Sequence, residues 1–310
     1  MGSSLLDIVR RSPAPATAVA VFGPDEVFTR VVHGTADLTT GRPVTDEDWW
    51  DLASLTKVLV TLPEVRDLVP NPDLPLEDLW PEARGYAVGR ATVRALLTHT
   101  AGLPATVPFY RTATGRDAVL RAVLAQPLGP PEEVYSDLGF MLLGRMVEAL
   151  SGRTLDALAR DRTGLRFGAP PSSSVATELD PWRGRLIVGE VHDENAAAMG
   201  GVAGQAGAFG TLSLVTAAAQ TWLRGPAITP ARPGATFGLG WMVTPRPGLG
   251  STRLPGFGHT GYVGNRLWLS PSRGLGVLIL ANRVHPTREG TAEPYVRWCS
   301  SLFAHLESRI

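Results

Sequence analysis

DLASLTKVLV, residues 51–60, places a serine, Ser54, three positions before a lysine, Lys57, at the start of an apolar run with helical character. Residues three apart on a helix share one face, so the hydroxyl and the amine can touch. A free serine is a weak nucleophile and needs a neighbouring base to take its proton. A lysine can act as that base when its surroundings lower its pKa. We therefore interpret the stretch as a compact unit of nucleophile and base.

Taken alone, the same stretch also fits an ordinary helix start, because serine is a common N-cap and lysine is ordinary on a helix surface. Two distant motifs decide between these interpretations. Tyr135-Ser136-Asp137 precedes a strongly apolar helical pattern over residues 138–150. Its tyrosine could be a core residue with a satisfied hydroxyl, or a phenol that shuttles a proton between nucleophile and leaving group.

The third motif is His259-Thr260-Gly261-Tyr262, at the expected start of a strand. A backbone N–H at this point could complete an oxyanion hole with the N–H of Ser54. The structural alternative is a glycine-flanked strand edge with a packed histidine.

Composition limits the function further. The 310 residues contain 29 Lys and Arg against 29 Asp and Glu, so the charge balance favours neither nucleic acid nor an acidic membrane surface as a partner. No apolar run has membrane-spanning length, and the first residues lack the basic and apolar segments of a signal peptide. We therefore expect a cytoplasmic enzyme that acts on small molecules. The single cysteine, Cys299, is expected to fill the core of a C-terminal helix.

The order of β-like and helical patterns predicts the architecture. Alternating apolar runs occur near the start of the chain and again after residue 233, where four are expected over 237–243, 253–258, 265–270 and 275–281. Helical periods dominate between them. This predicts an α+β fold, in which residues 1–50 and 233–310 form one antiparallel sheet region and residues 51–232 form a mainly helical region. The active site is expected in the cleft between the two regions.

A glycine-rich stretch over residues 199–207 follows His192 and Asp193. So many glycines indicate close backbone approach. A phosphate-binding loop would need a following Gly-Lys-Ser/Thr, which is missing from the sequence. A metal site at the adjacent His192 and Asp193 is conceivable, but a turn is the better interpretation. We expect no cofactor and no metal.

Together, the three motifs resemble those of serine hydrolases related to class C β-lactamases. That superfamily also includes penicillin-binding proteins, D-Ala-D-Ala carboxypeptidases, D-amino-acid-specific peptidases and carboxylesterases. The segment ATVRALLTHTAGL (91–103) is similar to the family pattern (I/V)-(T/R)-x-LLTHTSGL. YSDLGFMLLG (135–144) is similar to YSNxGYxLLG, and LANRVHP (280–286) resembles the last strand and the turn into the closing helix.

The resemblance implies a β-lactamase/transpeptidase-like fold, with terminal helices flanking the sheet and an inserted all-helical region. It implies that Ser54 is the acylated nucleophile and Lys57 its proton acceptor. Tyr135 would work with Lys57 in proton transfer to the leaving group and in activating the deacylating water. The backbone N–H groups of Ser54 and Tyr262 would hold the oxyanion. Which of Lys57 and Tyr135 is the base stays open.

Two departures from the lactamase pattern bear on the substrate. Asp137 stands in place of an asparagine, so an amide becomes an acceptor-only carboxylate. His259 stands in place of a lysine that attracts a substrate carboxylate, and an unperturbed histidine is mostly neutral at pH 7. Asp137, His259, Thr260, Gly261 and Tyr262 are expected to bind substrate, and Arg288 could supply a fixed cation.

The sequence therefore predicts a serine hydrolase that forms an acyl-enzyme, most simply a carboxylesterase or a D-amino-acid amidase or peptidase. The alternatives are a β-lactamase or D-Ala-D-Ala carboxypeptidase, and a penicillin-binding module without turnover.

Overall fold

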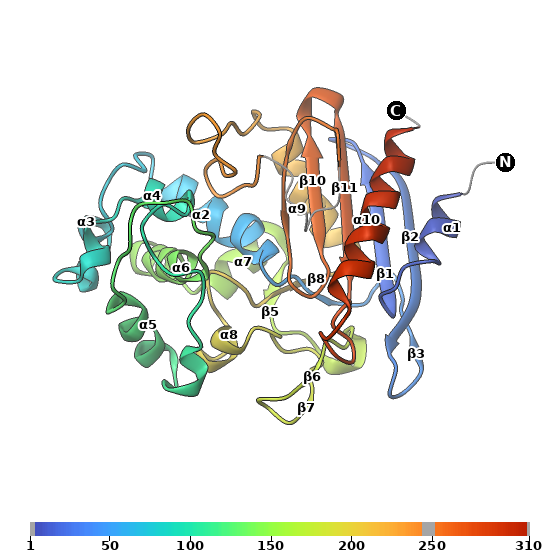
Figure 1. Ribbon diagram of the computed structural model, residues 1–310, viewed down its shortest axis with the longest axis horizontal. Coiled ribbons are helices and arrows are strands. Elements are labelled where there is room, and N and C mark those ends of the chain that lie inside the picture. Colours follow the sequence, from blue (N-terminus) through green and yellow to red (C-terminus); the bar gives the residue numbers. More distant parts are fainter. Residues whose placement is uncertain (1–3, 244–251, 309–310) are drawn as a thin grey trace.

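The computed structural model describes residues 4–243 and 252–308 and is built around one antiparallel sheet (Figure 1). The strand order is β3-β2-β1-β11-β10-β9. Strand β1 pairs with β11 from Thr17 opposite Ala281 to Phe22 opposite Gly276, so the two ends of the chain meet at the centre of the sheet. The strands are β1 Ala16–Phe22, β2 Val27–Asp37, β3 Arg42–Pro43, β9 Phe257–Thr260, β10 Arg266–Ser270 and β11 Leu275–Ala281.

Helices cover both faces of this sheet. All seven residues of β1 are buried, as its nearly continuous apolar sequence requires for a strand covered on both sides. The C-terminal helix α10 (Ala292–Glu307) lies in front of the sheet in Figure 1, and α9 (Leu212–Leu223) lies behind it. The short N-terminal helix α1 (Leu5–Val9) joins α10 through the indole N–H of Trp298, which donates to the carbonyl of Ile8.

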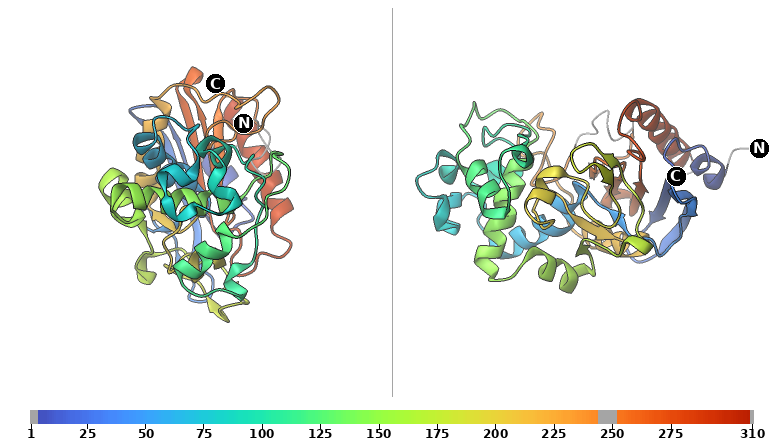
Figure 2. Two further views of the ribbon diagram at one scale, coloured as in Figure 1. Left: turned by 90° about the vertical axis from the view of Figure 1, so that its left-hand side faces the viewer. Right: turned by 90° about the horizontal axis from the view of Figure 1, so that it is seen from below.

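The remaining helices form a region beside the sheet (Figure 2). At its centre, α6 (Asp137–Ser151) buries ten of its fifteen residues and ends at Gly152 in the left-handed conformation. Around it lie α2 Leu62–Leu68, α3 Leu76–Leu79, α4 Val93–Leu97, α5 Arg116–Leu124, α7 Leu155–Thr163 and α8 Glu194–Ala198, with 3₁₀ turns at Pro81–Ala83, Ala87–Arg90, Phe109–Arg111 and Pro171–Ser173. A further 3₁₀ turn, Pro271–Arg273, connects β10 to β11.

Two small sheets lie apart from the large one. One has the order β4-β8-β5, from Trp50–Asp51, Ala208–Gly210 and Arg166–Phe167. The other pairs β6 (Leu179–Asp180) with β7 (Arg185–Leu186). Strand β4 ends three residues before Ser54, so the first of these small sheets anchors the start of the segment that contains Ser54 and Lys57.

The structure differs from the sequence prediction in three places. Helix α9 falls within residues 51–232 but packs on the large sheet, because the apolar face of its alanine-rich sequence covers β1, β10 and β11. Residues 237–243 make only isolated bridges, from Met242 to Phe237 and to Gly258, in place of a strand. The strand expected over 253–258 runs instead over Phe257–Thr260.

In the described part of the chain, no helix combines the length and the apolar character needed to cross a bilayer.

Candidate active site

Ser54 follows a tight turn that connects β4 to the helix that carries Lys57. Ala53 has a φ of 47°, which side-chain-bearing residues rarely adopt. Its N–H donates to the buried carboxylate of Asp51 over 2.7 Å, which holds the turn. The helix after Ser54 opens with a π-helical segment, Lys57–Thr61, a form that is frequent at functional sites.

The Lys57 ammonium is fully buried and surrounded by three acceptors. Nζ lies 2.8 Å from Ser54 Oγ, 2.7 Å from Asp137 Oδ1 and 3.0 Å from the carbonyl oxygen of Gln205. An ammonium has three N–H donors, so these contacts match its charged form.

The sequence interpretation required surroundings that lower the pKa of Lys57, and the structure shows the opposite. Burial alone would lower the pKa, but the Asp137 carboxylate and Tyr135 outweigh it and hold the pKa of Lys57 above its ordinary value. Asp137 is thus the ion-pair partner of Lys57, in addition to lining the cavity.

The glycine-rich stretch supplies one of these acceptors by close packing on α6. A Cβ atom on Gly204 would lie 2.1 Å from the carbonyl oxygen of Phe140, so only glycine fits. The carbonyl of Gly204 accepts a hydrogen bond from the Thr61 hydroxyl at 2.7 Å. The next carbonyl, of Gln205, is thereby placed against Lys57. This close backbone packing explains why the stretch is rich in glycine, and no phosphate-binding role is needed.

Tyr135 lies beside Lys57, whose Nζ is 5.2 Å from the centre of the phenol ring. Burial raises the pKa of Tyr135 and the Lys57 charge only partly offsets it, so the phenol is neutral at rest. His99 holds this segment in place. Its Nδ1 accepts the N–H of Ser136, its carbonyl accepts the N–H of Val134, and its ring centre lies 4.7 Å from that of Tyr135.

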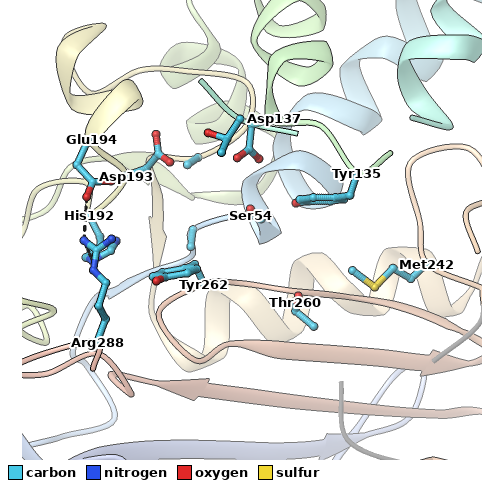
Figure 3. A pocket seen from close by; sticks show the side chains of 13 residues that line it. Ser54, Tyr135, Asp137, His192, Asp193, Glu194, Met242, Thr260, Tyr262 and Arg288 are labelled. Carbon is cyan, nitrogen blue, oxygen red and sulfur yellow. Dashed lines mark hydrogen bonds and ion pairs between the residues drawn. The ribbon is translucent and has the colours of Figure 1, made fainter. Parts of the chain in front are cut away.

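A cavity of about 590 Å³ opens in front of Ser54 (Figure 3). Six of the residues selected from the sequence line it, namely Ser54, Tyr135, Asp137, Thr260, Tyr262 and Arg288. The small or apolar residues Ala53, Ala206 and Met242 also contribute to the wall. The volume suits a small substrate.

The β9 end meets the Ser54 turn through close backbone packing. A Cβ atom on Gly261 would lie 2.7 Å from the carbonyl oxygen of Leu52, and the Asn265 side chain donates to the carbonyl of Asp51 at 2.8 Å. Among the residues described, no hydrogen bond uses the backbone N–H of Ser54 or of Tyr262 as donor. Both N–H groups stay available for an oxyanion.

His259 occupies a different place from the one expected. Its side chain is fully buried and does not line the cavity. Nδ1 lies 2.9 Å from the carbonyl oxygen of Thr260, and the ring centre lies 5.8 Å from that of Tyr135. The geometry therefore places His259 in the core beside Tyr135 and off the cavity wall.

Arg288 does reach the cavity, but two carboxylates neutralise it. Its guanidinium binds Glu178 at 2.6 Å and Glu194 at 2.8 Å, and these contacts raise its pKa. Glu178 also bonds the ring of His192 at 2.8 Å. Burial of Glu178 is outweighed by the hydrogen bonds from His192 and Arg288, which lower its pKa to about 2. Arg288 is therefore already paired and does not offer a free cation to a substrate carboxylate.

His192 and Asp193 each have partners within the protein. His192 stacks on Tyr262 with ring centres 5.7 Å apart, and the Asp193 carboxylate caps α8 through the N–H of Ala196. Among residues 4–243 and 252–308, no three His, Cys, Asp or Glu side chains are placed to hold a metal ion.

Sequence reasoning missed several residues of this site. Asp51, His99 and Gln205 hold the segments that carry Ser54, Tyr135 and Lys57, and Asp193 lines the cavity. The sequence matches His99 to a family segment and presents Asp193 as a conceivable metal ligand, but neither pattern indicates these contacts. The sequence signal that pointed towards Asp193 and Gln205 was the acidic pair Asp193-Glu194 close to the glycine-rich stretch.

Comparisons with known proteins identify the family of the chain. The sequence model of the β-lactamase family matches residues 5–300. A putative D-alanyl-D-alanine carboxypeptidase of Escherichia coli (strain K12) is 27% identical, over 87% of this chain and 79% of that protein. An N-acetylmuramyl-L-alanine amidase of Bacillus subtilis (strain 168) is 27% identical, over 83% of this chain and 73% of that protein.

Solved structures share the fold. A class C β-lactamase from Rhodobacter sphaeroides superposes with a TM-score of 0.73 at 19% identity and covers 97% of both chains. EstCE1, described as a hydrolase with promiscuous acyltransferase activity, has a TM-score of 0.70 at 18% identity, over 96% of this chain and 98% of its own. The α+β fold is therefore the β-lactamase/transpeptidase-like fold expected from the motifs, and the chain belongs to the β-lactamase family of serine hydrolases.

Proposed function

We propose that the protein hydrolyses small esters or amides, as a carboxylesterase or a D-amino-acid amidase, through an acyl-enzyme on Ser54. The observation that carries this proposal is the contact of 2.8 Å between Ser54 Oγ and Lys57 Nζ at the wall of the cavity. The reaction is an attack of Oγ on the carbonyl carbon, loss of the alcohol or amine, and hydrolysis of the resulting ester by water.

The cations of the site argue against a substrate carboxylate as the main anchor. Lys57 is paired with Asp137, and Arg288 is paired with Glu178 and Glu194. His259 is buried away from the cavity. A β-lactam or a peptide ending in D-alanine carries a carboxylate, so neither is the substrate class that this cavity supports best.

Lys57 and Tyr135 divide the proton transfer in the proposed mechanism. Lys57 must first lose a proton, and its neutral amine then takes the proton of Ser54 as the Oγ–C bond forms. Tyr135, neutral at rest, donates its proton to the leaving group and recovers one from Lys57. The N–H groups of Ser54 and Tyr262 stabilise the oxyanion.

The test is a comparison of p-nitrophenyl acetate and nitrocefin, with the Ser54→Ala variant as the blank for each. We expect turnover of the ester with a kcat/KM at least tenfold above that of the β-lactam. Efficient nitrocefin turnover with little ester hydrolysis would contradict this proposal and identify the protein as a β-lactamase. A stable adduct without turnover of either compound would identify a penicillin-binding module.

A second expected result concerns the pH dependence of ester hydrolysis. Because the pKa of Lys57 is raised, only a small fraction of its amine is neutral at pH 7. As long as the pH is below that pKa, this fraction increases tenfold for each unit by which the pH rises. The kcat/KM for a neutral ester should therefore increase by about 10²-fold from pH 7 to pH 9. Asp137→Asn removes the carboxylate that raises the pKa, burial then lowers it, and the rising limb should move to lower pH.

The measurement is kcat/KM for p-nitrophenyl acetate between pH 6 and 10, in wild type and Asp137→Asn. The Ser54→Ala variant corrects for hydroxide-catalysed hydrolysis. If the limb stays in place in Asp137→Asn, Lys57 is not the group whose ionisation controls acylation.

A further inference from the structure

The charged side chains around the cavity leave one carboxylate without a cation. Asp137, Asp193 and Glu194 lie along the same side of the pocket, opposite Thr260 and Tyr262 (Figure 3). Asp137 is paired with Lys57, and Glu194 is paired with Arg288. Within the part of the chain that the structure describes, no Lys, Arg or His side chain forms an ion pair with Asp193.

The hydrogen bonds of Asp193 occupy only one of its oxygens. Oδ1 accepts the N–H of Ala196 at 2.7 Å and the side-chain amide of Gln205 at 3.3 Å. Oδ2 receives no donor from the described residues, and neither does Oδ2 of Asp137. Capping of α8 therefore accounts for Oδ1 of Asp193 but not for Oδ2. Oδ2 of Asp193 and Oδ2 of Asp137 are thus two carboxylate oxygens at the cavity that have no donor among the described residues.

The surroundings of Asp193 are unfavourable for its charge when the cavity is empty. Burial and the neighbouring Asp137 carboxylate raise its pKa to about 6, although the N-terminus of a helix normally favours a negative charge. The Gln205 side chain that bonds it is itself fully buried, and its Oε1 has no hydrogen-bond partner among the described residues. A positive group between the two carboxylates would offset this repulsion.

This position lies next to the nucleophile. The Gln205 backbone carbonyl accepts from Lys57 while its side chain donates to Asp193, so one residue connects the two groups. Asp137 is likewise bonded to Lys57, which contacts Ser54 Oγ. A cation held by both carboxylates therefore lies near the carbonyl that Ser54 attacks.

We propose that Asp193, with the second oxygen of Asp137, binds a primary ammonium group on the carbon next to the scissile carbonyl. The preferred substrates are then aminoacyl esters or amides with a free α-amino group. This inference rests on the proposed function and narrows it to a specificity for cationic acyl groups, with Asp193 as a substrate-binding residue.

The test uses two acyl groups of the same shape. Alanine S-benzyl thioester and S-benzyl thioisobutyrate differ only in an ammonium group in place of a methyl group. The ratio of their kcat/KM values is measured by thiol release at pH 7.5 for each alanine enantiomer. It includes the intrinsic activation of the carbonyl by the ammonium group, which is the same for every enzyme variant, so the change of the ratio between variants isolates the contribution of the charge on Asp193. We expect a ratio of at least tenfold in favour of one alanine enantiomer.

Three variants assign this ratio to Asp193. Asp193→Asn keeps the size and the helix-capping ability of the side chain but removes the charge, and it should lower the ratio by about tenfold or more. Asp193→Glu retains the charge and should keep a ratio above that of Asp193→Asn. Glu190→Gln, a matched removal of one negative charge outside the cavity, should leave the ratio at its wild-type value.

The pH dependence of the ratio provides a second readout. The groups that face Asp193 are Asp137, Glu194 and Lys57. In wild type the ratio should fall below about pH 6 as Asp193 gains a proton, and again above about pH 8 as the substrate amine loses one. Asp193→Asn should lose the acidic fall and keep the alkaline one.

The outcomes separate this inference from the proposed function. Hydrolysis of the thioisobutyrate at a rate equal to or above that of both alanine enantiomers overturns ammonium recognition and leaves the serine hydrolase intact. A wild-type ratio retained in Asp193→Asn assigns the selectivity to other residues and overturns the role of Asp193. Failure to hydrolyse any of these thioesters or p-nitrophenyl acetate contradicts both proposals.

Discussion

Ser54→Ala is expected to lower kcat for every hydrolysed substrate to the uncatalysed background, a loss of about 10⁴-fold or more. The reason is chemical. The acyl-enzyme needs an oxygen nucleophile at this position, and Ser54 Oγ is the hydroxyl that contacts Lys57 in the cavity wall. The side chain is small and partly exposed, so its loss should leave the fold and the melting temperature almost unchanged.

The matched control is Ser213→Ala, an exposed serine on α9 on the far side of the sheet from α10. It should retain wild-type kinetics. Turnover by Ser54→Ala at more than one hundredth of the wild-type rate would place the nucleophile on another residue.

Lys57→Met and Tyr135→Phe should each reduce kcat for a neutral ester by about 10²-fold or more. In the proposed mechanism Lys57 takes the proton of Ser54 and Tyr135 passes a proton to the leaving group, so both residues belong to one proton relay. The double variant should therefore lose much less than the product of the two single effects. Thermal unfolding serves as the control, because Lys57→Met also removes the buried partner of Asp137.

Fully multiplicative effects would show that the two residues act in separate steps. A rate near wild type in Tyr135→Phe would leave its hydroxyl without a part in the reaction and assign the whole proton transfer to Lys57.

Much of this fold could be predicted because its signals are local. The apolar strands at both ends of the chain indicated a sheet shared between them, and β1 does pair with β11. The contact of Ser54 with Lys57 follows from helical spacing alone. The sequence places helix α9 in the helical region but does not indicate that it packs on the large sheet, because an apolar helix face does not reveal which surface it covers.

The electrostatics of the site could not be predicted, because its charges come from distant segments. Asp137 lies 80 residues after Lys57 and reverses the direction of its pKa shift. Glu178 precedes Arg288 by 110 residues and neutralises it. The sequence shows that both cations are present but not that each one is already paired.

The positions of His259 and Thr260 could not be predicted from the sequence either. Alternation along β9 predicts that adjacent side chains face opposite ways, but not which of them faces the cavity. The structure buries His259 and places Thr260 on the cavity wall. Sequence analysis therefore selected a strand end that lies at the cavity, but His259 is on its buried side.

The most direct test of the account is to locate the covalent adduct. Wild-type protein would be quenched in acid during turnover of a slow ester or treated with a fluorophosphonate, digested and analysed by peptide mass spectrometry. The account predicts one adduct, on Ser54 in the peptide that contains residues 51–60, and none in Ser54→Ala. An adduct on any other residue, or labelling that persists in Ser54→Ala, would contradict it.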